Sequence, residues 1–157
     1  MFKLYKDILS KKEQNNLLNF IKSNLKVWGE TYPGLQTSPD LHLYDEMKPF
    51  LQGIKKYYKN YSIDKCWGNH TKGDYIYWHT HSQYSLSIVY YLKNPSGVGV
   101  MFKDTSITSY DSIIYTNGPE NSLVVFDSNK VHSVPNDYKL KDRYSIALEL
   151  TIWFSKN

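Results

Sequence analysis

Two histidines separated by a single residue, His79 and His81, are the first feature of this sequence that could do chemistry. They precede a serine- and tyrosine-rich run within the segment YWHTHSQYSLSIVYYL, residues 77–92. Neutral imidazole nitrogens are common metal ligands. Side chains two positions apart on an extended segment also point to the same side. The pair therefore predicts either a shared metal site or, as the simpler alternative, a solvated loop.

Two further residues, His132 and Arg143, could complete such a site. His132 lies between an expected strand and a Pro-Asn turn, where a histidine on its own is most often a surface residue. Arg143 is the single arginine among 19 basic residues. On an alternating strand it shares a face with Ser145 and Ala147, and this leaves a polar space able to seat a carboxylate. The alternative is that the single arginine occurs at the start of this strand by chance.

Other candidate ligands have less support from their surroundings. His70 is a rival ligand, but it lies outside the His-x-His spacing and is expected on a strand or at the rim of a site. His42 falls in an expected helix and is interpreted as structural. Asp74, Asp104 and Asp127 could each supply a carboxylate ligand, although their neighbours predict turns or strand ends.

Length and composition exclude several classes of protein. A chain of 157 residues with a net charge of +4 has room for one domain, and its lysines are too scattered to indicate nucleic-acid binding. The single cysteine, Cys66, excludes an internal disulfide framework and a cysteine-based zinc site. Neither a membrane-spanning run nor a secretory signal is visible. We therefore predict a soluble protein in a reducing, cytoplasmic setting.

Two helices are expected in the first 60 residues. Ser10 and Glu13 form a capping-box pattern, and the apolar spacing that follows predicts a helix over about 10–24. Apolar spacing also predicts a second helix over about 40–59, with a break or kink at Pro49.

The rest of the chain is a series of short β-rich runs separated by turn-forming residues. Two helices followed by many strands predict a mainly β (α+β) protein in one domain, residues 1–157, with an antiparallel β-sandwich or jelly-roll core over about 61–154 backed by the helices. The expected strands are residues 61–71, 74–81, 85–92, 98–104, 122–127 and 143–154.

The order and spacing of these motifs resemble one family, the 2-oxoglutarate- and Fe(II)-dependent oxygenases. The resemblance covers about residues 28–151 and is greatest to a bacterial and phage group related to prolyl hydroxylases. The segments WGNHTKGDYIYWHTHSQYSLSIVYYL, PENSLVVFDSNKVHSVPND, DRYSIALEL and YPGLQTSPDLH each resemble a motif of that group. Asn121 stands where the group usually has glycine. The resemblance implies a double-stranded β-helix (jelly-roll, cupin-like) fold and is compatible with a phage-encoded protein.

The resemblance also implies a metal centre. His79 matches the first iron ligand and His132 the distal ligand. His81 matches the second ligand, which is usually a carboxylate in the wider superfamily, so three neutral imidazoles would hold the iron here. This departure from the usual pattern leaves open whether His81 or an acidic residue is the third ligand.

Four residues match the positions that bind 2-oxoglutarate in this family. Arg143 matches the cation that pairs with the C5 carboxylate of the cosubstrate, and Ser145 is a possible second donor. Tyr91 matches a tyrosine that hydrogen-bonds the same carboxylate in prolyl-hydroxylase-like members. Asn69 matches another side chain that contacts the cosubstrate.

The activity implied is that of a dioxygenase that consumes O2 and 2-oxoglutarate, with ascorbate as an optional reductant, and hydroxylates a small-molecule or peptidyl substrate. Two alternatives remain: a three-histidine cupin-like dioxygenase without 2-oxoglutarate, and a non-catalytic β-sandwich interaction module. Residues 30–39 and 103–118 are expected to line the mouth of the cleft, whereas Trp67 and Tyr90 are expected in the core. The sequence indicates neither the substrate nor the oligomeric state.

Overall fold

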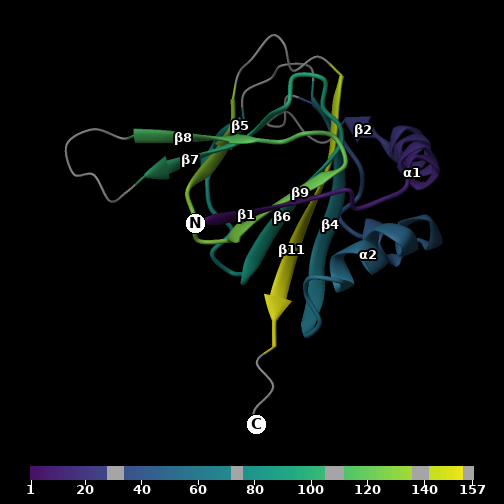
Figure 1. Cartoon of the computed structure of the whole chain (residues 1–157), viewed down its shortest axis with the longest axis horizontal. Coiled ribbons are helices and arrows are strands. Elements are labelled where there is room, and N and C mark those ends of the chain that lie inside the picture. Colours follow the sequence, from purple (N-terminus) through teal and green to yellow (C-terminus); the bar gives the residue numbers. More distant parts are fainter. Residues whose placement is uncertain (28–33, 72–75, 105–111, 136–141, 154–157) are drawn as a thin grey trace.

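The larger of two antiparallel sheets forms the base on which the rest of the protein packs. The computed structural model describes residues 1–27, 34–71, 76–104, 112–135 and 142–153 (Figure 1). The larger sheet has the strand order β1-β9-β6-β11-β4-β3-β2. In chain order its strands are β1 (Phe2–Lys6), β2 (Lys26–Val27), β3 (Leu35–Gln36), β4 (Tyr61–Thr71), β6 (Leu86–Lys93), β9 (Ser122–Asp127) and β11 (Arg143–Ile152).

The smaller sheet has the order β5-β10-β7-β8 and covers one face of the larger sheet. Apolar side chains from β6, β7 and β9 meet between the two sheets, among them Tyr91, Phe102 and Phe126. This arrangement is the double-stranded β-helix expected from the sequence. The strands of the smaller sheet are β5 (Ile76–His79), β7 (Val98–Asp104), β8 (Ser112–Asn117) and β10 (His132–Val134).

Helix α1 (Lys11–Asn24) begins as the sequence predicts. The backbone N–H of Glu13 donates to Ser10 Oγ at 3.3 Å, and the backbone N–H of Ser10 donates to a Glu13 carboxylate oxygen at 2.8 Å. Its apolar face buries Leu17 and Ile21 against the outer face of the larger sheet. There Ile21 packs directly over Gly68, where a side-chain Cβ would come within 2.9 Å of it. The helices therefore leave the inner face of the sheet free for a site.

The second helix is shorter than the predicted 40–59. Two 3-10 turns, η1 (Leu41–Leu43) and η2 (Asp45–Met47), precede helix α2 (Lys48–Lys55). Pro49 lies in the first turn of α2, where its missing N–H has no intrahelical partner to lose, so the helix begins there and is not kinked. Figure 1 shows α1 and α2 on the same side of the larger sheet. Across the described ranges, no helix is long and apolar enough to span a membrane.

Several short strands were not expected from the sequence. β1 is paired over its whole length with β9, and β2 and β3 are two-residue strands at the far edge of the same sheet. β8 lies within residues 103–118, which were predicted to be a loop, and pairs with β7 instead. A short strand contains too few residues to show an alternating pattern in the sequence. Its conformation is therefore decided by pairing with a neighbouring strand. Residues 105–111 and 30–33 of the two predicted cleft loops lie outside the described ranges.

Asn121 should be a stabilising residue in its own right, although it replaces the glycine of the resembling group. Its backbone has φ 61°, the left-handed region in which glycine is favoured. Its side-chain oxygen accepts from the Leu9 N–H at 2.9 Å and the Tyr90 hydroxyl at 2.8 Å, and its amide donates to Leu9 O at 2.7 Å. We expect Asn121→Gly to lower the free energy of unfolding by about 2 kcal/mol in urea titrations, because buried polar groups lose their partners.

Asp7→Gly is the matched control for that prediction. Asp7 also has a positive φ, 57°, but its side chain is exposed. This variant should be at least as stable as the original protein, since glycine relieves the backbone. Equal loss in both variants would show that the Asn121 hydrogen bonds contribute nothing.

Candidate metal and anion site

Strand pairing brings together two histidines that are far apart in the sequence. His79 ends β5, His132 begins β10, and the two are direct partners across this antiparallel pair. Directly opposed residues project their side chains to the same face. His81 follows two residues after His79, where its backbone N–H donates to Ser128 O at 2.9 Å. This bond holds the chain beyond β5 close enough for the third ring to join the other two.

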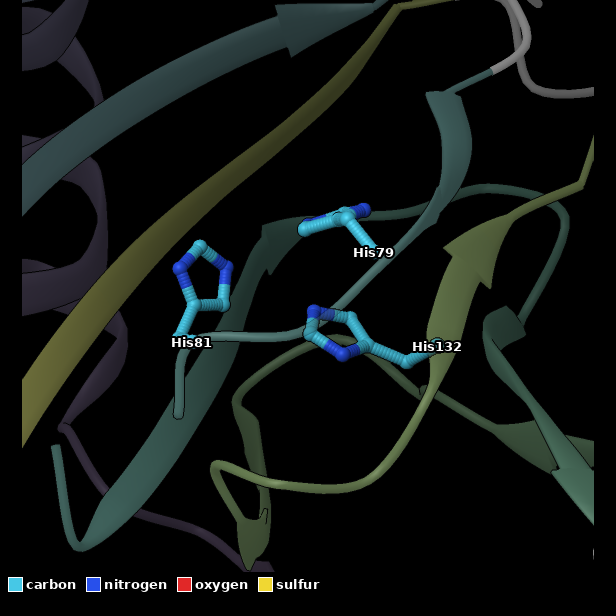
Figure 2. Close-up of side chains that lie close together, drawn as sticks. All are labelled: His79, His81 and His132. Atoms are coloured by element: carbon cyan, nitrogen blue, oxygen red, sulfur yellow. The ribbon is translucent and has the colours of Figure 1, made fainter. Parts of the chain in front are cut away.

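The three imidazoles share one space (Figure 2). One nitrogen from each ring lies within 4.8 Å of the others. The ring centroid of His79 is 4.9 Å from that of His81 and 4.3 Å from that of His132. Three imidazoles with open space beside them are a donor set that suits Fe, Cu, Zn or Ni ions. The donor set therefore fits a divalent metal.

Two of the rings are held in the orientation that metal binding needs. Nδ1 of His79 lies 2.6 Å from Tyr77 O, and Nδ1 of His132 lies 2.9 Å from Lys130 O. A carbonyl oxygen only accepts, so each Nδ1 carries the hydrogen and each Nε2 keeps a free lone pair. In metal sites, such a hydrogen bond from the nitrogen that does not bind the metal fixes the tautomer of the ligand histidine.

The local environment keeps two of the rings neutral. Burial lowers the pKa of His132 to about 4, and the nearby His79 and His81 add to this effect while the Lys130 carbonyl opposes it. Burial likewise lowers the pKa of His81 to about 4, with further contributions from His79 and Lys65. Both rings are therefore uncharged at neutral pH, which is the form that binds a metal.

A second feature, a buried cation, lies on the neighbouring sheet. Arg143 is only 2% exposed, and its Nε and Nη1 have no hydrogen-bond partner within the described part of the chain. Thr71, its partner across β4 and β11, has a buried hydroxyl that is likewise unpaired among those residues. Buried polar groups without partners are rare and costly. Two guanidinium nitrogens and a hydroxyl that lack partners in this part of the chain are donors that suit an anion, and most simply a carboxylate.

The other predicted cosubstrate residues lie around this cation. Asn69 and Ser145 are cross-strand partners and both line the same cavity as Arg143. Asn69 Oδ1 accepts from Gln36 Nε2 at 2.8 Å, which holds this side chain in place in the cavity wall. Tyr91 is fully buried beneath Arg143, whose Cζ is 4.9 Å from the ring centroid, and its hydroxyl accepts from the Val100 N–H. Tyr91 does not line the cavity.

A single cavity of about 390 Å³ joins the histidine cluster to the cation. Its walls come from the inner face of the larger sheet and from β5 and β10 of the smaller one. Trp67 is one of its lining residues and is only partly buried, so its placement in the core was wrong, whereas Tyr90 is fully buried as expected. Trp67 lies two residues before Asn69 on β4, so the two side chains lie on the same face of the sheet.

The rival ligands lie elsewhere. His70 points to the opposite face of β4 and stacks on Tyr144, with ring centroids 4.3 Å apart. His42 lies in η1, and Asp104 and Asp127 end β7 and β9, none of them in the histidine cluster. Asp74 lies outside the described ranges.

One acidic residue was overlooked in the sequence: Glu149 lines the cavity and is 2% exposed. Its Oε1 lies 3.7 Å from Nε2 of His81. Burial raises the pKa of Glu149 to about 7, although hydrogen bonds from Ser87 and Ser128 oppose the shift. Alternation along β11 could have revealed it, because Glu149 falls on the same face as Arg143. The same reasoning on β4 would have revealed Thr71.

The fold is one that a known class of proteins shares. The chain has the double-stranded β-helix fold of the 2-oxoglutarate- and Fe(II)-dependent oxygenases, and its histidine cluster lies where two sheets of that fold meet. No protein-family model matches the sequence, and no curated protein does.

Several solved structures are similar to this protein in fold. HygX from Streptomyces hygroscopicus, solved with nickel and 2-oxoglutarate, is 10% identical over 98% of this chain and 83% of HygX, with a TM-score of 0.74. SnoN, a non-haem α-ketoglutarate-dependent epimerase of nogalamycin biosynthesis, is 10% identical over 96% of this chain and 77% of SnoN, with a TM-score of 0.75. A prolyl hydroxylase from Trichoplax adhaerens, in complex with a hypoxia inducible factor peptide, is 15% identical over 96% and 83%, with a TM-score of 0.69. At these identities the likeness is one of fold.

Proposed function

We propose that this protein is an Fe(II)- and 2-oxoglutarate-dependent dioxygenase that hydroxylates its substrate and releases succinate and CO2. The observation that carries the proposal is the cavity itself. Three convergent imidazoles line the same 390 Å³ space as a buried guanidinium, two of whose nitrogens lack a partner among the described residues. A ligand that chelates a metal at one end and carries a carboxylate at the other would satisfy both features.

The chain's own residues would orient that ligand. Arg143 would pair with the C5 carboxylate of 2-oxoglutarate through Nε and Nη1, the two donors that have no partner among the described residues. The Thr71 hydroxyl would donate to the same carboxylate, and Ser145 and Asn69 line the same cavity. Tyr91 would act from below, by packing its ring against the guanidinium.

The metal would be held by Nε2 of His79, Nε2 of His132 and the ring of His81. When bound with 2-oxoglutarate, Fe(II) supplies the activation of O2 that oxidises a substrate C–H bond. The protein contributes the position of the ligands and a partly enclosed cavity that limits access of water.

One specific observation favours a rival. Three neutral histidines are also the expected ligand set of a cupin-like dioxygenase that needs no 2-oxoglutarate. That enzyme has no use for a buried arginine in the same cavity as the metal. Burying this cation is costly, because no carboxylate pairs with it within the described ranges. Arg143 therefore favours the 2-oxoglutarate-dependent reaction.

The substrate is proposed only as a class. HygX has been solved with hygromycin B, a small molecule, and the Trichoplax prolyl hydroxylase with a peptide fragment. By analogy we propose a small molecule or a peptide side chain that enters beside Trp67.

An anaerobic titration tests the proposal directly. Fe(II) is added to the purified protein, followed by 2-oxoglutarate, and the visible absorption that arises when a 2-oxo acid chelates Fe(II) is measured. We expect saturable absorption with about one cosubstrate per protein. Pyruvate, which has the keto-acid end but lacks the C5 carboxylate, should need at least about tenfold higher concentrations because it cannot use Arg143. Iron binding without any chelate absorption would instead favour the cupin-like enzyme.

A further inference from the structure

Glu149 is a carboxylate in the cavity wall that the proposed reaction does not yet use. It lies on β11, where its direct partners are Lys65 on β4 and Ser87 on β6. The residue is 2% exposed, so its charge is almost completely removed from solvent. A carboxylate is expensive to bury unless a cation or several donors compensate it.

The two carboxylate oxygens have different surroundings. Oε2 accepts from the hydroxyl of Ser87 at 2.7 Å and, more weakly, from that of Ser128 at 3.4 Å. Oε1 faces Nε2 of His81 at 3.7 Å. The two serine hydroxyls also contact each other at 2.9 Å, which fixes the orientation of the carboxylate. Oε1 is therefore held toward the histidine cluster.

The compensation that Glu149 receives from the protein is incomplete. Within the described ranges, no lysine or arginine nitrogen lies within 4.0 Å of its carboxylate, and its nearest basic side chain is the His81 ring. The Lys65 charge favours the carboxylate from beyond this distance. The cation that the geometry adds next to His81 is a metal held by His79, His81 and His132.

Charge supports the same conclusion. Three neutral imidazoles leave a divalent metal with its full charge of two, whereas two imidazoles and one carboxylate halve it. A buried carboxylate that contacts the third imidazole would lower the net charge of the site in the same way, without binding the metal itself. Carboxylates that contact a ligand histidine also fix its ring and strengthen its metal bond.

We propose that Glu149 is a positioning residue of the metal centre, which holds the His81 ring in place and supplies the negative charge that a three-histidine ligand set lacks. This inference rests on the proposed function, because it needs a metal at the histidine cluster. It adds a residue on a different strand and sheet from the three histidines.

Glu149→Gln tests the role because glutamine keeps the shape and the hydrogen bond from Ser87 while removing the charge. The dissociation constant of Co(II) is measured anaerobically, together with the visible ligand-field bands of the bound ion. We expect Co(II) affinity to fall by about tenfold and the bands to shift, because the negative charge next to the His81 ring is lost. A purely structural role would lower the thermal midpoint and leave both metal readouts unchanged.

Two further variants separate the effect of the Glu149 charge from a general effect on folding. Glu120→Gln makes the same change in an exposed glutamate outside the cavity and should bind Co(II) like the original protein. Ser87→Ala retains the charge but removes the strongest hydrogen bond to Glu149, so it should weaken Co(II) binding by a smaller factor. Should Glu149→Gln fail to fold, Ser87→Ala with unchanged affinity and bands would overturn the role.

The failure of this inference differs from the failure of the proposed function. Co(II) binding with equal affinity and equal bands in the original protein and in Glu149→Gln would overturn only the role of Glu149. Absence of Co(II) binding to the original protein would overturn both.

Discussion

His132→Ala should reduce metal affinity by roughly 100-fold or more, equivalent to about 2.7 kcal/mol, and His79→Ala should do the same. Each substitution removes one of three imidazoles whose nitrogens lie within 4.8 Å of one another. His132 is 5% exposed and lines the cavity, so its removal also enlarges that space. Metal content after dialysis, and calorimetric titration with Ni(II) or Fe(II), measure the effect.

Two controls separate metal binding from general damage. His70→Ala removes a histidine that is equally buried but stacks on Tyr144 on the opposite face of β4, so it should destabilise the fold and spare metal binding. Thr80→Val changes the exposed residue between His79 and His81 and should have no effect on either property. Stoichiometric metal in dialysed His132→Ala protein would exclude the cluster as the metal site.

Arg143→Lys should weaken 2-oxoglutarate binding by about tenfold or more, and Arg143→Gln by about 100-fold. Lysine keeps the positive charge, but a single ammonium cannot reproduce the planar pair of donors, Nε and Nη1, that has no partner in the described structure. Glutamine loses the charge as well. Metal affinity should be nearly unchanged in both variants, because the guanidinium is not part of the histidine cluster. The measurement is the anaerobic chelate titration at saturating Fe(II).

Pyruvate provides the internal control for Arg143. Because pyruvate lacks the C5 carboxylate, its binding should respond little to either substitution. Thr71→Val, which removes the neighbouring unpaired hydroxyl, should weaken 2-oxoglutarate binding by a smaller factor than Arg143→Gln. Equal 2-oxoglutarate affinity in the original protein and Arg143→Lys would show that the guanidinium does not bind the cosubstrate.

Local sequence patterns predict much of the secondary structure, and which side chains share a face, without information on which strands pair. The capping box at Ser10 and Glu13 predicts the start of α1, and both of its hydrogen bonds are present. Two-residue alternation predicts that His79 and His81 share a side and that Arg143 shares a face with Ser145. These features depend on residues within one turn or one extended segment, so the sequence predicts them. His81 itself lies beyond the end of β5, where its bond to Ser128 positions it.

The tertiary structure decided everything that depends on which strands are neighbours. The opposition of His79 and His132 comes from the pairing of β5 with β10, and no residue near either histidine indicates it. Alternation along β11 puts Glu149 on the same face as Arg143, but only the folded structure brings Ser87, Ser128 and His81 to its carboxylate. Trp67 shares a face of β4 with Asn69 by alternation, but only the packing of the two sheets makes that face a wall of the cavity. Pairing of this kind joins segments that are distant in sequence, and its energy comes from packing and burial across the whole sheet, which a local pattern does not contain.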